Sequence, residues 1–168
     1  MKQGRLKLKK GGLDTIIAYI VVSLPLLYVL IYMVATIYHF SVQMYVSQVV
    51  KEATVMASTY GALTASHESY IRGKLADVFD EDEHGNTCDI TFYIREFDES
   101  TGTVGAIRPA SGLPLGHKAD IIGISVKSVK PSMLGNVSAF SIFGTNSENP
   151  DLYYNAYREE IIRNERPT

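Results

Sequence analysis

Four histidines and one cysteine are the residues of this chain best suited to metal binding or nucleophilic catalysis. None of His39, His67, His84 and His117 lies at metal-ligand spacing from a second histidine or from Cys88. Cys88 has no activating base beside it in the sequence, so we expect a buried or unreactive thiol. The sequence also contains no glycine-rich phosphate loop, nucleophile elbow or paired acidic motif. We therefore predict no enzyme activity, no metal and no cofactor.

One acidic segment, DEDEHGN at residues 80–86, has part of the pattern of a calcium loop. Its Asp-x-Asp start and its glycine at the sixth place fit that pattern. His84 stands at the fifth place, however, and Thr91 stands at the twelfth, where a bidentate glutamate is needed. We expect a solvated turn before a strand, with a calcium site as the minor alternative.

The charge of the chain is strongly segregated, although its 168 residues have a net charge of only −2. Between Asp14 and Lys51 there are 36 consecutive positions without Asp, Glu, Lys or Arg, and the remainder of the chain is acidic. Five basic residues precede this run: Lys2, Arg5, Lys7, Lys9 and Lys10. Because the only dense basic cluster adjoins an apolar run, we exclude a nucleic-acid binder built on a basic surface.

Residues 13–40 are predicted to form a transmembrane helix. The apolar run from Thr15 to Phe40 exceeds the roughly 20 residues that cross a bilayer core, and a helix is the form in which a single segment satisfies its backbone in lipid. The basic residues 1–12 predict a cytoplasmic leader and an extracytoplasmic C-terminal part. A cleaved secretory signal is the alternative, but its apolar region would be shorter. Pro25 predicts a kink or local unwinding near residues 21–25.

An amphipathic pattern follows the apolar run and predicts that the helix continues to about residue 60, beyond the membrane. Apolar residues recur at steps of three and four: Val42, Val46, Val49, Val50, Ala53, Met56, Tyr60 and Leu63. We expect the chain's own C-terminal domain to cover this stripe, or else neighbouring copies of the chain. Gly61 should end the helix, and a short second helix is expected from Ser66 as its cap to Phe79. Residues 41–79 thus form a protruding helical region.

Residues 80–168 are predicted to form a small β domain. In residues 88–98, Ile90, Phe92 and Ile94 alternate with polar residues, and in residues 118–131 Ile122, Ile124 and Val126 do the same. Residues 98–102 indicate a turn, and residues 152–163 indicate a final strand or a short helix, with the strand preferred. The predicted fold class is α+β: a long N-terminal helix, a short helix and an antiparallel sheet.

This order of elements, with Gly11-Gly12, Leu13-Asp14 and a Pro-containing helix before a β domain, resembles the TadE-like minor pilins, or pseudopilins, of the type IV pilin superfamily. The resemblance implies that a prepilin peptidase cuts between Gly12 and Leu13. In that family a glutamate at the fifth mature position helps to dock the subunit, whereas this chain has Ile17 there and an acid, Asp14, at the second position. Asp14 is either a docking residue or an interfacial N-cap.

The expected function is that of a membrane-anchored structural subunit that assembles with itself or with other pilin-like subunits in a pilus, secretion or conjugation apparatus. The helix residues expected to take part in assembly are Asp14, Pro25, Val42, Val46, Val49, Val50 and Met56. The alternative is a bitopic membrane protein whose β domain binds a ligand or the cell wall. Both hypotheses place the chain in a lipid membrane.

Overall fold

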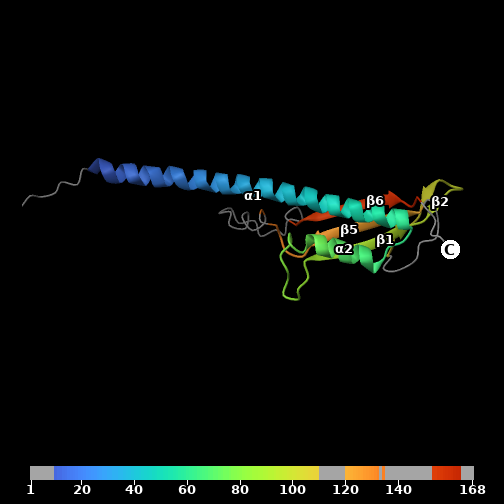
Figure 1. Ribbon diagram of the computed structural model, residues 1–168. Helices are drawn as coiled ribbons and strands as arrows, with labels where there is room; N and C mark the ends of the chain where they lie inside the picture. The colour runs from blue at the N-terminus through green and yellow to red at the C-terminus, as the bar shows by residue number, and fades with distance from the viewer. Residues whose placement is uncertain (1–9, 110–119, 133, 135–152, 164–168) are drawn as a thin grey trace, which may run out of the picture.

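The computed structural model describes residues 10–109, 120–132, 134 and 153–163 of the chain. Helix α1 (Lys10–Tyr60) is followed by helix α2 (Ala65–Leu75) and then by the strands. The strands are β1 (Cys88–Arg95), β2 (Phe97–Asp98), β3 (Thr103–Val104), β4 (Arg108–Pro109), β5 (Ile121–Ser128) and β6 (Asn155–Ile161). The predicted α+β class, with a long helix, a short helix and a small antiparallel sheet, is confirmed (Figure 1).

In the described part of the chain, the main sheet has the strand order β4-β1-β5-β6, and every neighbouring pair is antiparallel. Its register aligns Phe92 with Ile124 and Ile124 with Arg158. Strands β2 and β3 form a separate hairpin, whose turn contains Gly102 at a φ of 66°. The expected turn at residues 98–102 and the preferred final strand are therefore confirmed.

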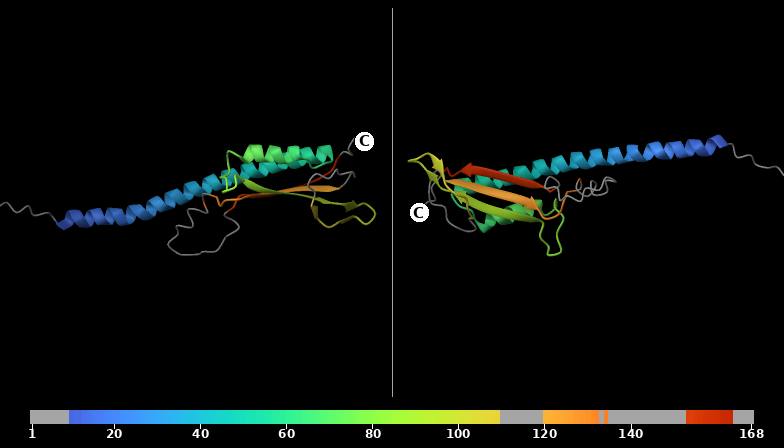
Figure 2. Two further views of the ribbon diagram at one scale, coloured as in Figure 1. Left: turned by 90° about the horizontal axis from the view of Figure 1, so that it is seen from below. Right: turned by 180° about the vertical axis from the view of Figure 1, so that it is seen from behind.

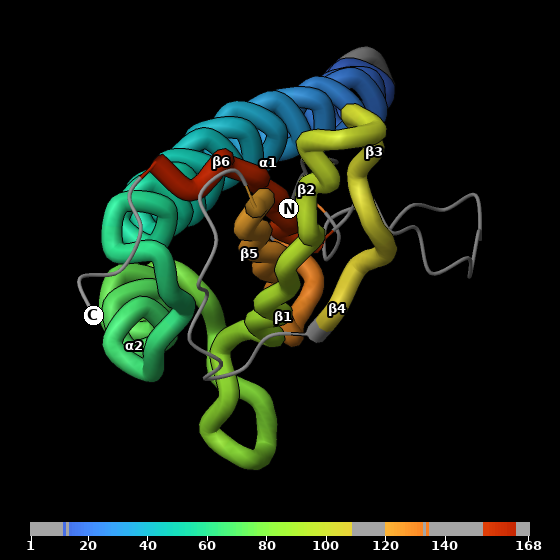
Figure 3. Tube along the Cα trace, turned by 90° about the vertical axis from the view of Figure 1, so that its right-hand side faces the viewer, coloured from blue at the N-terminus to red at the C-terminus, as the bar shows by residue number. Residues whose placement is uncertain are grey.

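One face of the sheet is apolar because its strands alternate as the sequence predicts. The register places Ile90, Phe92 and Ile94 of β1 on the same face as the buried residues of β5. Ile122, Ile124 and Val126 of β5 are fully buried. This is the face that the helices cover, as the views from below and from the end show (Figures 2 and 3).

The second half of α1 lies along the sheet, whereas its first half extends beyond the described strands and α2 (Figures 1 and 2). Two contacts fix its direction relative to β6. Near the start of the strand, the Gln43 side chain bonds both backbone groups of Asn155, and near its end the Arg163 N–H donates to the Ser58 carbonyl at 3.3 Å. Helix α1 and β6 therefore run parallel, and the start of β6 marks the end of the domain nearest the free half of α1.

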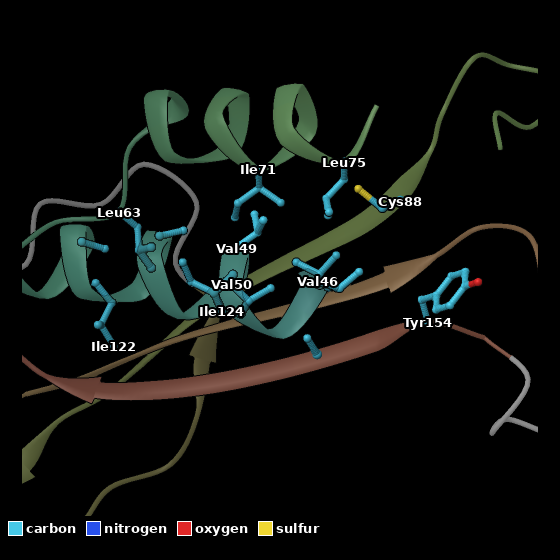
Figure 4. Packing of buried hydrophobic residues seen from close by; sticks show 14 of the residues in the cluster. Val46, Val49, Val50, Leu63, Ile71, Leu75, Cys88, Ile122, Ile124 and Tyr154 are labelled. Atoms are coloured by element: carbon cyan, nitrogen blue, oxygen red, sulfur yellow. The ribbon is translucent and has the colours of Figure 1, made fainter. Parts of the chain in front are cut away.

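In the part of the chain that the structure describes, one hydrophobic core joins α1, α2 and the sheet (Figure 4). Val46 and Val50 of α1, Ile71 and Leu75 of α2, and Ile124 of β5 are fully buried in it. The described residues of the two expected regions, 41–79 and 80–168, therefore share one core. Burial of α1 begins at Ala35, before residue 41, so the packed domain includes part of the segment expected to be transmembrane.

The ends of the helices follow from local backbone chemistry. Gly61, at a φ of 64°, ends α1, and the Ala62 N–H returns to the Ala57 carbonyl at 3.3 Å, as in a Schellman motif. The cap of α2 is Thr64 rather than Ser66, and α2 ends at Leu75 rather than at residue 79. The change of cap follows from His67, which lies at the position where a capping-box side chain can bond back to residue 64.

Candidate membrane-spanning and assembly segment

The free half of α1 is apolar on every side. All large apolar residues from Ile16 to Val34 are between 42% and 73% exposed within the chain. At 1.5 Å per residue this segment is about 28 Å long, close to the roughly 30 Å of a bilayer core. Among the described residues, this is the one helix long and apolar enough to span a membrane, and it lies near the N-terminus.

Hydroxyl groups in and just beyond the segment donate to the helix backbone. Ser23 Oγ donates to the Ile20 carbonyl at 3.2 Å, Thr36 Oγ1 to the Tyr32 carbonyl at 2.8 Å, and Ser41 Oγ to the Ile37 carbonyl at 2.9 Å. Each hydroxyl proton is thereby satisfied without water. This arrangement suits an apolar environment, in which an unbonded polar group costs several kcal/mol.

The tyrosines of the segment differ in what they contact. The rings of Tyr28 and Tyr32 stack with centroids 6.5 Å apart, and both side chains remain more than 40% exposed. Tyr45, beyond the segment, donates its hydroxyl to the Lys74 carbonyl at 3.3 Å. Tyr19 is 73% exposed. Tyr45 thus contacts protein within the chain, whereas the rings of Tyr19, Tyr28 and Tyr32 are exposed.

Gly12, Leu13 and Asp14, the residues around the expected cleavage site, lie within helix α1. Because α1 begins at Lys10, Asp14 lies beyond its first turn and is not its N-cap, which corrects one of the two expected roles. Gly12 and Asp14 are exposed, and an added Cβ at Gly12 would meet nothing within 4 Å. Lys2, Arg5, Lys7 and Lys9 lie outside the described residues, as do the side chains of Lys10 and Leu13.

Pro25 lies within an unbroken stretch of helix. It has no N–H to donate to the Val21 carbonyl, which removes one helical hydrogen bond. Helix α1 is continuous through residues 21–25, so the expected local unwinding is absent, and the alternative, a kink, stays a prediction. Pro25 therefore removes one hydrogen bond from α1 without ending the helix.

The second half of α1 uses its apolar stripe inside the chain. Val42, Val46, Val49 and Val50 are 7%, 0%, 2% and 0% exposed and pack in the hydrophobic core, and Met56 packs against that core. The chain's own sheet and α2 thus cover the stripe except at Tyr60, which was also expected on it and is 68% exposed. On the opposite face of this half, Phe40 is 61% and Met44 is 74% exposed.

A polar and aromatic cluster on the outer face of the sheet was not anticipated from the sequence. Tyr93 is only 4% exposed, and its ring stacks on Tyr157 with centroids 5.5 Å apart. Gly123 lies directly beneath that ring, and Arg95 pairs with Glu159 at 3.3 Å beside it. Burial, followed by hydrogen bonding to Tyr157, raises the pKa of Tyr93. The available signal was a glycine in the middle of a strand otherwise rich in branched residues.

Cys88 is buried, and the acidic turn is held by hydrogen bonds to its own backbone. Cys88 is 1% exposed, burial raises its pKa, and its carbonyl accepts a bond from Arg72 Nη1 at 3.0 Å. In the acidic turn, Asp82 Oδ1 accepts the backbone N–H groups of His84 and Asn86 at 2.8 and 2.7 Å. Within the described residues, no group of three or more His, Cys, Asp or Glu side chains could hold a metal ion.

Comparisons with known proteins give no match: no family model, no curated protein and no solved structure corresponds to this chain.

Proposed function

We propose that this protein is a membrane-anchored, pilin-like structural subunit of the TadE-like kind. One observation carries the proposal: a single continuous helix is membrane-length and exposed in its first half, and is the spine of a β domain in its second half. An enzyme tethered by a separate anchor would not need this continuity. A subunit that assembles through its helix does need it, because the shared helix fixes the domain relative to its neighbours.

The exposed segment requires a cover. Large apolar patches on a protein surface mark sites of contact with membranes or proteins. Lipid covers Ile16–Val34 while the subunit is in the bilayer, and helices of neighbouring subunits replace that lipid in an assembly. The charge pattern supports an orientation with the basic N-terminal leader in the cytoplasm and the β domain on the other side.

Processing between Gly12 and Leu13 forms part of the proposal, with a prepilin peptidase as the partner. Cleavage would bring the new amino terminus close to Asp14. Intact-mass spectrometry of the protein from its native membrane tests this step. Loss of the first 12 residues supports it, and a full-length chain in the assembled state contradicts it.

Asp14 is proposed as the docking residue. An ionised carboxylate near the inner membrane surface is costly unless it has a partner, and the amino terminus of a neighbouring subunit would provide one. Asp14→Ala should leave membrane insertion intact and reduce co-purification with pilin-like subunits. Asp89→Ala, at an exposed position of β1, is the matched control and should change neither. Unchanged co-purification of Asp14→Ala would contradict the docking role.

The alternative, a bitopic ligand- or cell-wall-binding protein, makes a different prediction. A domain released by truncation should then retain its binding activity without neighbouring copies. The truncation should follow residue 34, because His39 stacks on Tyr154 at 5.0 Å and belongs to the packed domain.

A further inference from the structure

A pocket of about 280 Å³ opens at the end of the domain nearest the free half of α1. It is lined from three parts of the chain: Tyr38 of α1, Val78 to Asp80 after α2, and residues of the β5 and β6 ends that include Lys130 and Tyr154. The volume is slightly below the range of drug-sized ligand sites, so the pocket suits a small polar group rather than a large ligand.

The position of the pocket relative to the membrane follows from the length of the apolar segment Ile16–Val34. If the bilayer core ends near Val34, Tyr38 lies about 6 Å further along the helix. The headgroup layer on one side of a bilayer is roughly 5–8 Å thick. Tyr38, and the mouth of the pocket beside it, therefore fall at the level of the lipid headgroups, where tyrosine is enriched.

Two opposite charges line this pocket. Lys130 and Asp80 are both exposed, and neither forms an ion pair within the described part of the chain. The Lys130 backbone is held in place, since its carbonyl accepts a bond from Ser128 Oγ at 2.8 Å. One free cation and one free anion in a single pocket match a ligand that carries a phosphate and an ammonium group.

The apolar wall of the pocket is backed by a stack of three aromatic rings. Tyr154 is sandwiched between His39, at a centroid distance of 5.0 Å, and Phe79, at 5.5 Å, with its ring nearly parallel to both. Tyr154 is 5% exposed, and its backbone N–H donates to Ser128 Oγ at 3.1 Å. The stack joins α1, the loop after α2 and the start of β6. The pocket therefore keeps its shape as long as α1 stays packed on the domain.

We propose that this pocket binds the headgroup of a zwitterionic phospholipid, with the phosphate at Lys130 and the ammonium group at Asp80. The acyl chains would follow the exposed apolar surface of α1 into the bilayer. This inference rests on the proposed membrane anchoring. It adds that the β domain binds a lipid headgroup of the membrane that anchors α1. This contact fixes the angle between the domain and the membrane before assembly.

The test uses the full-length protein purified in mild detergent with equal amounts of phosphatidylethanolamine and phosphatidylglycerol. Native mass spectrometry measures the lipid that remains bound. We expect phosphatidylethanolamine to be retained preferentially, and Lys130→Ser and Asp80→Asn each to reduce its retention at least fivefold. Lys127→Ser and Asp89→Asn are the matched controls, since both residues are exposed on the sheet and neither lines the pocket, and they should retain it.

Flotation of the same variants with phosphatidylethanolamine vesicles separates the two proposals. Wild type and every variant should float, because α1 alone inserts into the bilayer. Flotation together with equal lipid retention by wild type and Lys130→Ser overturns the headgroup site and leaves the anchor standing. Preferential retention of phosphatidylglycerol also overturns it, since that headgroup carries no cation for Asp80. A wild-type chain that fails to float overturns the anchor and this inference with it.

Discussion

At the scale of single residues, one close contact lies on the outer face of the sheet, between Tyr93 and Gly123. The Tyr93 ring fills the space above Gly123, where an added Cβ would lie 1.9 Å from Tyr93 Cζ. The two residues are register partners on β1 and β5. Glycine at this position thus admits an aromatic ring that is buried without belonging to the core between the sheet and the helices.

Gly123→Ala should therefore destabilise the fold. Displacing the buried Tyr93 ring is an overpacking change, for which we expect a loss of about 1–3 kcal/mol in the free energy of unfolding. In a Tyr93→Ala background the same change should cost markedly less, because the clash is gone. Chemical denaturation of the four proteins of this cycle measures the coupling. Equal costs of Gly123→Ala in both backgrounds would contradict the contact.

Gly73→Ala is the matched control for the glycine cycle. Gly73 is an exposed position of α2 where an added Cβ meets nothing within 4 Å. Alanine should stabilise the helix there by about 0.5–1 kcal/mol, through helix propensity alone. The two glycines thus predict opposite signs for the same substitution.

His67 makes the cap of α2 sensitive to pH. Its Nδ1 accepts the Thr64 N–H at 3.1 Å and lies 2.9 Å from Thr64 Oγ1, and the side chain is 5% exposed. Burial lowers the pKa of His67. Because the folded state favours the neutral ring, its contribution to stability is complete above a pH of about 6.5, the ordinary pKa of histidine. The contribution is lost as the pH falls below that value towards the lower pKa of the folded state.

The midpoint of thermal unfolding of the full chain should therefore fall between about pH 7.5 and pH 5.5. His67→Gln should show a smaller fall over the same interval, since glutamine can accept the Thr64 N–H but does not titrate. The difference between the two proteins is the quantity to measure, because other groups titrate in both. Parallel pH profiles would rule out this role of His67.

At the scale of elements, α1 divides its surface between two environments. Val46 is fully buried in the core, while Met44, two residues earlier on the same helix, is 74% exposed. The three- and four-residue spacing of the valines predicted this division correctly. It could not show whether the covering surface came from the same chain or from another copy.

Substitution of Val46 and of Met44 distinguishes the buried face of α1 from its exposed face. Val46→Ala should lower the free energy of unfolding by roughly 2 kcal/mol, through lost burial and an unfilled cavity. Met44→Ala should change it by less than about 0.5 kcal/mol, as expected for an exposed position. Denaturant titration in micelles measures both. A large effect at Met44 in the isolated chain would mean that this face is also packed within the fold.

The accuracy of the sequence-based predictions followed the strength of the local signal. Alternation predicted β1 and β5, and the glycine at residue 61 predicted the end of α1, because each feature depends on neighbouring residues. The cap of α2 and the Tyr93–Gly123 contact were missed. A ring that settles over a glycine across two strands depends on sheet register, and register is set by pairing along the whole strand.

The candidate membrane segment was predictable in position but not in its upper boundary. Composition locates a long apolar run, yet it cannot show where a helix leaves lipid and begins to pack on protein. Ala35 is fully buried, so this change occurs before residue 41, the start expected from polarity. The pocket beside Tyr38 combines residues from three distant parts of the chain, and no local pattern in the sequence marked it.

At the scale of the whole molecule, the described residues form an elongated protein. The exposed apolar helix Ile16–Val34, here called the rod, is followed by a folded domain. The domain buries most of its own apolar stripe. The rod has no comparable cover within the described part of the chain. Contacts between copies should therefore be concentrated in the rod rather than in the valine stripe of the second half of α1.

Disulfide cross-linking in native membranes tests this claim most directly. In a Cys88→Ala background, single cysteines at Leu27, Tyr28, Val29 and Leu30 sample every face of the helix. Lys127→Cys, exposed on the sheet, is the control. We predict oxidative cross-links to a second copy or to a partner subunit from one or two adjacent helix positions, and none from Lys127→Cys. Absence of cross-links at all four helix positions would contradict assembly through the rod.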